Sequence, residues 1–388
     1  MLTLQIRRLL TELLLRGPMP RSQLAANVGI NPSTVTRLTQ QLIDARYLRE
    51  GEALIEKRQP GRRAIELHLC ADEHFVIGIA INAYQQTVAV ANLTGTVLAR
   101  REVSRSWSPD PRASLSALAT AAREALSECG IALDQVVATG VACAGQVDPT
   151  GRRVESSPDI GWFQIPVAEW LEASLGPPVF VETMQNALNS TECAFGAAAG
   201  TRSSLLVSVA LGIGSSLIVD GKVVRARSQT LASMGHMPVA GVEALCNCGR
   251  RGCLNTVASG YAVLRRLGSA EGYERPQQHS PALASRLFEV LACAASDSTI
   301  AYELERAGEQ LGEALKSSIV IASPERIALS GPVAQMESYQ QGVRQALSPN
   351  ERDPFGWDGE LTVVSTRLED AAARLALHRQ VFLAEMQA

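Results

Sequence analysis

The chain has 388 residues, more than one ordinary hydrophobic core needs, so two or three domains are expected. Its 46% hydrophobic and 19% charged content is that of a folded, soluble protein. The longest apolar stretches, such as 205–211, are strand-sized, which argues against membrane insertion. Charged residues interrupt the apolar N-terminus, so no signal peptide is expected. Eight cysteines, three of them within 246–253, favour metal ligands and buried thiols over disulfides, and so a cytoplasmic location.

Charge is shared unevenly along the chain. Residues 1–63 hold eleven Lys and Arg against five Asp and Glu, a net +6, while the whole chain has −3 and the remainder therefore −9. A basic head on an acidic body is what a nucleic-acid-binding module attached to another domain would show. Charge alone does not separate this interpretation from a solvated basic face.

Helical spacing of apolar residues predicts three helices in the head, at 4–14, 21–27 and 32–45. Between the last two, Gly29 can adopt the positive φ of a tight turn, and Asn31 with Pro32 suits the start of a helix. This is the spacing of a helix-turn-helix, whose second helix enters a DNA major groove. A three-helix bundle with a polar outer face would give a similar pattern.

A hairpin with a basic tip follows these helices. Residues 47–52 and 64–69 read as strands, and the segment between them carries four cations around a Pro-Gly turn. A wing at this place can touch phosphates or the minor groove beside the third helix, so helix and wing together predict binding to double-stranded DNA. The residues expected to contact DNA are Arg21, Ser33, Thr34, Thr36, Arg37, Gln40, Arg58, Arg62 and Arg63.

From residue 75 onward the pattern predicts an α/β body built twice. The first block has strands at 75–81, 87–92, 97–103, 136–142 and 179–182, and helices at 112–129 and 187–199. The second block has strands at 205–211, 216–219, 326–329 and 361–364, and helices at 259–267, 281–295, 300–322 and 370–388. Strand-rich blocks that each change to helices favour a duplicated architecture with a cleft between the halves.

One imidazole and three thiols lie close together in the second block: His236, Cys246, Cys248 and Cys253. They can fill a tetrahedral Zn²⁺ site and leave no position for water, so the site would be structural. Gly249 and Gly252 let the loop fold back so that the last cysteine reaches the same ion. The alternative is three unrelated cysteines and a surface histidine.

Taken together, these residues resemble the ROK family (repressors, open reading frames and kinases), and within it the NagC/Mlc-like regulators. The resemblance rests on the winged helix-turn-helix, on 144–148, 157–162 and 211–214, and on Gly235-His236-Met237 followed by Cys246-x-Cys248-x4-Cys253. It implies an α/β chain in which the winged helix-turn-helix precedes a duplicated actin-like ATPase (ribonuclease H-like) fold with a structural zinc. The expected domains are 1–70, then 74–192 with 365–388, and 193–364.

The kinase chemistry that the resemblance implies is missing from this sequence. The family's catalytic aspartate is replaced by Met184, whose thioether cannot accept a proton from a sugar hydroxyl. The first phosphate loop ends in Asn82 and lacks its carboxylate, and the glycine-rich loop at 212–216 is about two residues short of the family pattern. We therefore expect no enzyme activity.

The sugar site is also altered. Two glutamates that accept hydrogen bonds from sugar hydroxyls in the family are replaced by Ser233 and Asn255, and His236 cannot fully substitute if it binds zinc. A standard hexose is therefore not expected to bind in the usual way: the effector is a different, more anionic ligand, or the site is vestigial. The residues expected around this cleft are Asp159, Glu182, Asn186, Ser233, His236 and Asn255.

The sequence as a whole predicts a transcriptional regulator, and more specifically a repressor of carbohydrate-related genes that acts as a homodimer or tetramer. A sugar-related small molecule or a regulatory protein would control it. Two alternatives stay open here: a sugar kinase with an appended DNA-binding domain, and a ligand-free protein whose body only dimerises the heads.

Overall fold

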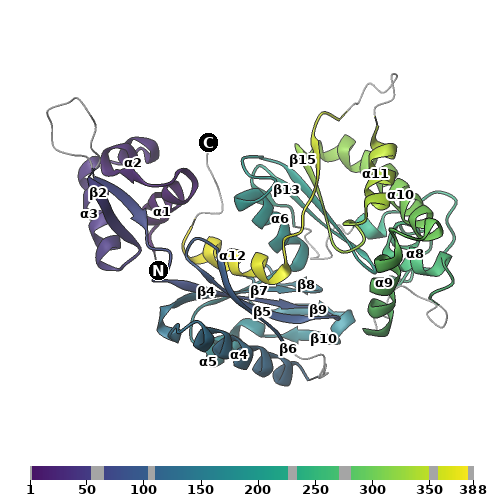
Figure 1. Cartoon of the computed structure of the whole chain (residues 1–388), viewed down its shortest axis with the longest axis horizontal. Coiled ribbons are helices and arrows are strands. Elements are labelled where there is room, and N and C mark those ends of the chain that lie inside the picture. Colours follow the sequence, from purple (N-terminus) through teal and green to yellow (C-terminus); the bar gives the residue numbers. More distant parts are fainter. Residues whose placement is uncertain are drawn as a thin grey trace.

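A computed structural model describes residues 2–53, 65–103, 110–225, 234–270, 281–348 and 357–382. It has a small N-terminal head and a larger body of two α/β halves (Figure 1). The α/β fold class and the duplicated body predicted from the sequence are confirmed. None of the helices in these ranges combines the length and hydrophobicity needed to span a lipid bilayer.

The head consists of three helices and a three-stranded sheet of order β1-β3-β2. Apolar side chains of all three helices and of β3 meet in one core that includes Leu9, Leu24, Val35 and Leu67, each fully buried. The elements are α1 (Leu4–Arg16), β1 (Met19–Pro20), α2 (Arg21–Val28), α3 (Pro32–Asp44), β2 (Leu48–Ala53) and β3 (Ile65–Leu69).

The first half of the body is a five-stranded sheet of order β11-β7-β4-β5-β6. Helices α4 and α5 pack on one face of this sheet and enclose a core of Val, Ile, Leu and Ala side chains. The sheet and its helices are β4 (Phe75–Ile81), β5 (Gln86–Asn92), β6 (Val97–Val103), α4 (Pro111–Glu128), β7 (Val136–Cys143), α5 (Val167–Leu175) and β11 (Val179–Thr183). A small sheet lies beside it, made of β8 (Gln146–Val147), β9 (Val154–Ser157) and β10 (Trp162–Ile165).

The second half repeats this topology in a sheet of order β14-β13-β12-β15-β16. In both halves a three-stranded antiparallel run is extended by two parallel strands, β7 and β11 in the first and β15 and β16 in the second. The elements are α6 (Met184–Phe195), β12 (Ser204–Val209), β13 (Ile213–Val219), β14 (Lys222–Val223), α7 (Asn255–Ala258), α8 (Gly260–Arg266), α9 (Pro281–Cys293), α10 (Ser298–Ala322), β15 (Arg326–Ser330), α11 (Glu337–Leu347) and β16 (Glu360–Val363).

The last helix, α12 (Leu368–Gln380), lies across the first sheet on the face opposite α4 and α5 (Figure 1). Its backbone approaches β4 and β7 closely because Gly78 and Gly140 carry no Cβ; a Cβ at either glycine would overlap the α12 backbone. The C-terminal end of α12 faces the head. This helix therefore contacts both the first half of the body and the N-terminal head.

The structure corrects several sequence expectations. Helix α6 begins at Met184, three residues before the expected 187, because the Thr183 side chain caps it by accepting a hydrogen bond from the Asn186 amide. Helices α5 and α11 were not expected, since their short apolar patterns lie beside prolines and glycines. The domain boundaries given above stay a prediction.

Candidate functional site

The turn between α2 and α3 has the geometry that the sequence predicts. Gly29 ends α2 in the left-handed region at φ 64°, a conformation that glycine adopts without strain. The Asn31 side chain accepts a hydrogen bond from the Ser33 amide at 2.9 Å, and Pro32 takes the first helical position. The outer face of α3 is thereby presented beside the β2–β3 hairpin.

Polar side chains cover that outer face. Ser33, Thr36, Arg37 and Gln40 are exposed, and Thr34 is half-buried. The Gln40 amide donates to Asp44 at 2.9 Å, the Ser33 hydroxyl to Asn31 at 2.8 Å and the Thr36 hydroxyl to the Pro32 carbonyl at 2.9 Å, so three of these groups are held by local hydrogen bonds. Their assignment as DNA contacts stays a prediction.

Arg21 is placed differently from the other expected DNA contacts. Its guanidinium donates to the Thr39 hydroxyl at 2.9 Å and pairs with Glu50 at 2.8 Å. It therefore links α2, α3 and β2, and helps to set the angle between the third helix and the hairpin. The remaining expected contacts, Arg58, Arg62 and Arg63, lie outside the described residues.

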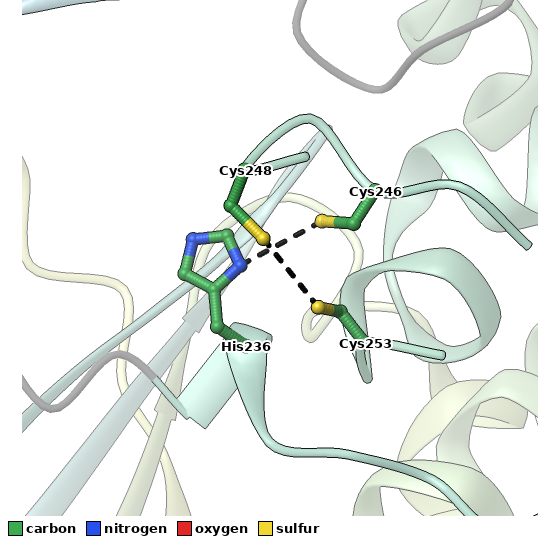
Figure 2. Close-up of side chains that lie close together, drawn as sticks. All are labelled: His236, Cys246, Cys248 and Cys253. Carbon is green, nitrogen blue, oxygen red and sulfur yellow. Dashed lines mark hydrogen bonds between the residues drawn. The ribbon is translucent and has the colours of Figure 1, made fainter. Parts of the chain in front are cut away.

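Four potential metal ligands come together in the second half (Figure 2). One ligand atom from each of His236, Cys246, Cys248 and Cys253 lies within 4.8 Å of the others. Backbone bridges from Pro238 to Cys253 and from Leu245 to Arg251 hold the loop, with Gly249 and Gly252 at positive φ. The predicted four-residue cluster is therefore present.

The spacing within this cluster fits a tetrahedral ion. Cys248 Sγ lies 3.6 Å from Cys253 Sγ, and Cys246 Sγ lies 3.6 Å from His236 Nδ1. Metal–sulfur bonds of about 2.3 Å at tetrahedral angles hold two sulfur ligands about 3.8 Å apart. Figure 2 shows the other ring nitrogen of His236 on the side away from the three sulfurs.

A cavity of about 220 Å³ lies between the two halves. Of the residues predicted for the cleft, Asp159, His236 and Asn255 line it. Ser233 lies outside the described residues. The other lining residues that matter for its chemistry are Asn82, Tyr84, Met184, Gln185, Gly212, Ile213, Gly214 and Asn247.

Glu182 and Asn186 are not among the residues that line this cavity, and their place in an effector cleft stays a prediction. Glu182 is 3% exposed, and its Oε1 accepts from the Asn186 amide at 3.0 Å and from the Thr183 backbone at 2.9 Å. Arg225 and Arg379 pair with the same carboxylate. Because Glu182 is the second-last residue of β11, these bonds hold the β11–α6 junction next to the cavity-lining Met184 and Gln185.

Asn255 lines the cavity, but its acceptor oxygen is already used. Asn255 Oδ1 accepts from the Ile213 amide at 2.7 Å, and the side chain is 4% exposed. A Cβ at Gly235 would lie 2.6 Å from that oxygen, so the absence of a side chain at this position leaves room for the Asn255–Ile213 hydrogen bond. The amide therefore holds the turn between β12 and β13.

The turn between β4 and β5 is held in the same way. Asn82 Oδ1 accepts from the Tyr84 amide at 2.8 Å and from the Gln85 amide at 2.9 Å. The Tyr84 ring packs against the core of the second half. Burial and the nearby Asp159 carboxylate raise the pKa of Tyr84, so its hydroxyl stays protonated.

Comparison with known proteins matches residues 76–375 to the ROK family. The chain belongs to the ROK family. Residues 7–52 match the IclR helix-turn-helix domain, and the combination of this head with a ROK body identifies a transcriptional regulator. The chain is similar to the DNA-binding transcriptional dual regulator NagC of Escherichia coli K12 and to the N-acetylglucosamine repressor of Escherichia coli O157:H7. Each is 26% identical over 327 residues, which cover 83% of this chain and 78% of the relative.

A solved structure and a kinase complete the comparison. A ROK family transcriptional regulator, described as a homolog of the E. coli MLC protein, matches with a TM-score of 0.78 at 23% identity and covers 97% of this chain and 96% of its own. The glucokinase of Streptomyces coelicolor is 32% identical over 189 residues, 49% of this chain and 57% of the kinase. The family thus includes both regulators and kinases.

Proposed function

We propose that this protein is an effector-controlled repressor of sugar-related genes that has no kinase activity. The observation that carries the proposal is the exposed polar face of α3, set on a helix-turn-helix that is fused to a ROK body. The names of the relatives support the carbohydrate connection and the repressing sign. The DNA that it would bind also supports the cytoplasmic location expected from the sequence.

Substitution of Arg37 by alanine tests the DNA-binding face. Arg37 is exposed on α3, and loss of a guanidinium that reads a base costs about 1–3 kcal/mol of binding free energy. Arg202→Ala is the matched control, because it removes one exposed arginine from the body. Fluorescence anisotropy on duplexes selected with the wild-type protein measures both; equal affinity of the Arg37 variant and the control would contradict the assignment.

A structural zinc ion is the second part of the proposal. His236, Cys246, Cys248 and Cys253 would hold it, and their spacing fits tetrahedral coordination. The ion would supply a cross-link between the loop at 246–253 and the 3₁₀ turn Met234–His236 that lines the cavity. Coordination through Nδ1 leaves Nε2 of His236 protonated, so the ring can donate a hydrogen bond.

Absence of kinase activity is supported by the cavity itself. Met184 stands where the resemblance to kinases would place the catalytic aspartate, and the backbone amides of Tyr84, Gln85 and Ile213 in the two turns already donate to Asn82 and Asn255. A nucleotide would need those donors for its phosphates. The cavity size and its neutral amides suit a small polar effector instead.

Calorimetric titration with hexoses, amino sugars and their phosphates tests the effector part of the proposal. We expect plain glucose to bind weakly or not at all, because the usual carboxylate acceptors are absent. Tight glucose binding would overturn this expectation. Failure of every ligand to bind or to raise the melting temperature would favour a body that only joins the heads in a homodimer or tetramer.

A further inference from the structure

One arginine of the head caps the end of a helix in the body. Arg7 of α1 donates from Nη2 to the backbone carbonyl of His378 at 2.5 Å and to that of Phe382. His378 is in the last turn of α12, where carbonyls lack partners within the helix and a cation is favoured by the helix dipole. Arg7 is thus a capping residue supplied by another domain.

Apolar packing surrounds this cap and makes it the centre of an interface. Phe382 is 1% exposed and Val381 is fully buried, both just beyond the end of α12. Burial and the neighbouring Arg379 lower the pKa of Arg7, which is partly withdrawn from solvent. The side chains that share this cluster of buried residues include Ile6, Leu9, Leu10 and Leu13 from α1, and Ala373, Ala376, Leu377, Val381 and Phe382 from α12 and its end.

The same turn of α12 also contacts the elements that support the cavity. Arg379, the residue after His378, lies 3.6 Å from Glu182, the second-last residue of β11. The His378 ring packs edge-on against Phe195 of α6, with 4.8 Å between ring centroids. Helix α6 begins with Met184 and Gln185, which line the cavity. One turn of α12 therefore touches the head on one side and the cavity-forming elements on the other.

Helix α12 also joins the two halves at its other end. Ala371 and Ala372 are fully buried in a cluster with Leu206 of β12 and Ala328 of β15. A displacement of one half relative to the other cannot leave α12 unchanged, because close-packed interfaces shift as units and do not deform smoothly.

We propose that Arg7 is a positioning residue that fixes the head to the C-terminal end of α12, so that the state of the cavity reaches the DNA-binding helix through α12. The inference rests on the proposed function, since it concerns how a DNA-binding head is oriented. Arg7 does not contact DNA in this scheme; it sets the spacing of two heads in a homo-oligomer, and with it the preferred distance between operator half-sites.

Hydrogen exchange tests the docking without any DNA, so its result is independent of the proposed function. Arg7→Gln removes the charge and, because its side chain is shorter, both hydrogen bonds to the α12 end. A hydrogen bond to a charged group is strong enough for at least about a tenfold rise in amide exchange in α1 and the last turn of α12. Arg8→Gln is the matched control, because Arg8 is the exposed neighbour on the same helix. Equal exchange in both variants would overturn the docking role.

DNA binding then tests the positioning role. On duplexes with paired half-sites, selected with the wild-type protein and re-spaced by one to five base pairs, Arg7→Gln should lose the preference for one spacing by about tenfold while keeping its affinity for a single half-site. An unchanged spacing preference would refute the proposal. If Arg7→Gln does not fold, Arg7→Lys, which keeps the charge but is one bond too short to reach both carbonyls from the same backbone position, should show the same loss of preference at a smaller size, and an unchanged preference would refute the proposal equally.

Discussion

The two halves of the body have one topology, and their first hairpin turns are equivalent by that topology. In the first half, Asn82 accepts hydrogen bonds from the amides of its own turn, between β4 and β5. In the second half, Asn255 does the same for the turn between β12 and β13, but from 42 residues further along the chain. Both turns face one cavity, and in both a side-chain amide occupies backbone donors that could otherwise bind phosphate.

The difference between the turns is the range of the contact that holds them. Asn82 acts within two or three residues, so the first turn is held by local sequence alone. Asn255 follows Cys253 of the cysteine cluster by two residues, so we expect the second turn to depend on how the 246–253 loop is folded. The first turn is therefore held by neighbouring residues alone, whereas we expect the equivalent turn of the second half to depend on the cysteine cluster.

Substitution of a cysteine of the cluster should have the largest effect on stability among the variants that test this difference between the two turns. Cys253→Ser should abolish stoichiometric zinc and lower the free energy of unfolding by on the order of 5 kcal/mol, because a structural ion contributes folding energy directly. Exchange of amides at 210–214 should rise far more than at 82–85. Zinc content, chemical denaturation and hydrogen exchange measure the three effects.

Cys129→Ser provides the control, since Cys129 is half-buried in the first half and outside the cluster. It should cost about 1 kcal/mol or less. If Cys253→Ser retained one zinc per chain and wild-type stability, the dependence of the second turn on the metal site would be wrong.

Replacement of the two asparagines by alanine should have intermediate effects of unequal size. Asn255→Ala leaves the Ile213 amide without its 2.7 Å acceptor in a buried place, at a cost of about 1–3 kcal/mol. Asn82→Ala frees two amides of a turn whose residues Tyr84 and Gln85 are less buried than Ile213, so we expect a smaller cost of about 1 kcal/mol. Urea denaturation of the two variants decides the order.

Asn82→Asp is the control for the smaller effect, because it keeps an oxygen in place to accept from Tyr84 and Gln85. It should lose less stability than Asn82→Ala. A larger loss of unfolding free energy for Asn82→Ala than for Asn255→Ala would contradict the interpretation that the second turn is the one held by residues distant in the chain.

The difference between local and long-range contacts also explains which parts of the structure could be predicted from the sequence. The α2–α3 turn and the cysteine cluster were predicted correctly because Gly29, Asn31, Gly249 and Gly252 act through local backbone requirements. The partners that hold Glu182 and Asn255 were not predicted, because they lie far away in the chain and no local pattern reveals them. Glu182 pairs with Arg225 and Arg379, and Asn255 reaches Ile213.

Arg21 shows most clearly what cannot be predicted from sequence position alone. A basic residue at the start of α2 fits a DNA contact by position, but its hydrogen bonds to Thr39 and Glu50 connect three elements of the head. Only the packing of β2 against α3 brings Glu50 within reach. A polar pattern predicts which face of a helix is exposed to solvent. Only the fold shows which of the exposed side chains already have hydrogen-bond partners within the protein.

Restoration of the missing catalytic carboxylate should have the smallest effect of all. Met184→Asp returns a base to the position that the resemblance assigns to it, and the side chain lines the cavity. We expect phosphoryl transfer to stay at background in a coupled ATPase assay with a panel of sugars, because the Tyr84, Gln85 and Ile213 amides still donate to Asn82 and Asn255, and Tyr84 still packs against the second half. A base contributes only when the phosphates are held in line with the attacking hydroxyl. Measurable activity of this single variant would mean that the turns accept phosphate despite their amides, and would overturn the comparison of the two halves on which the non-kinase proposal depends.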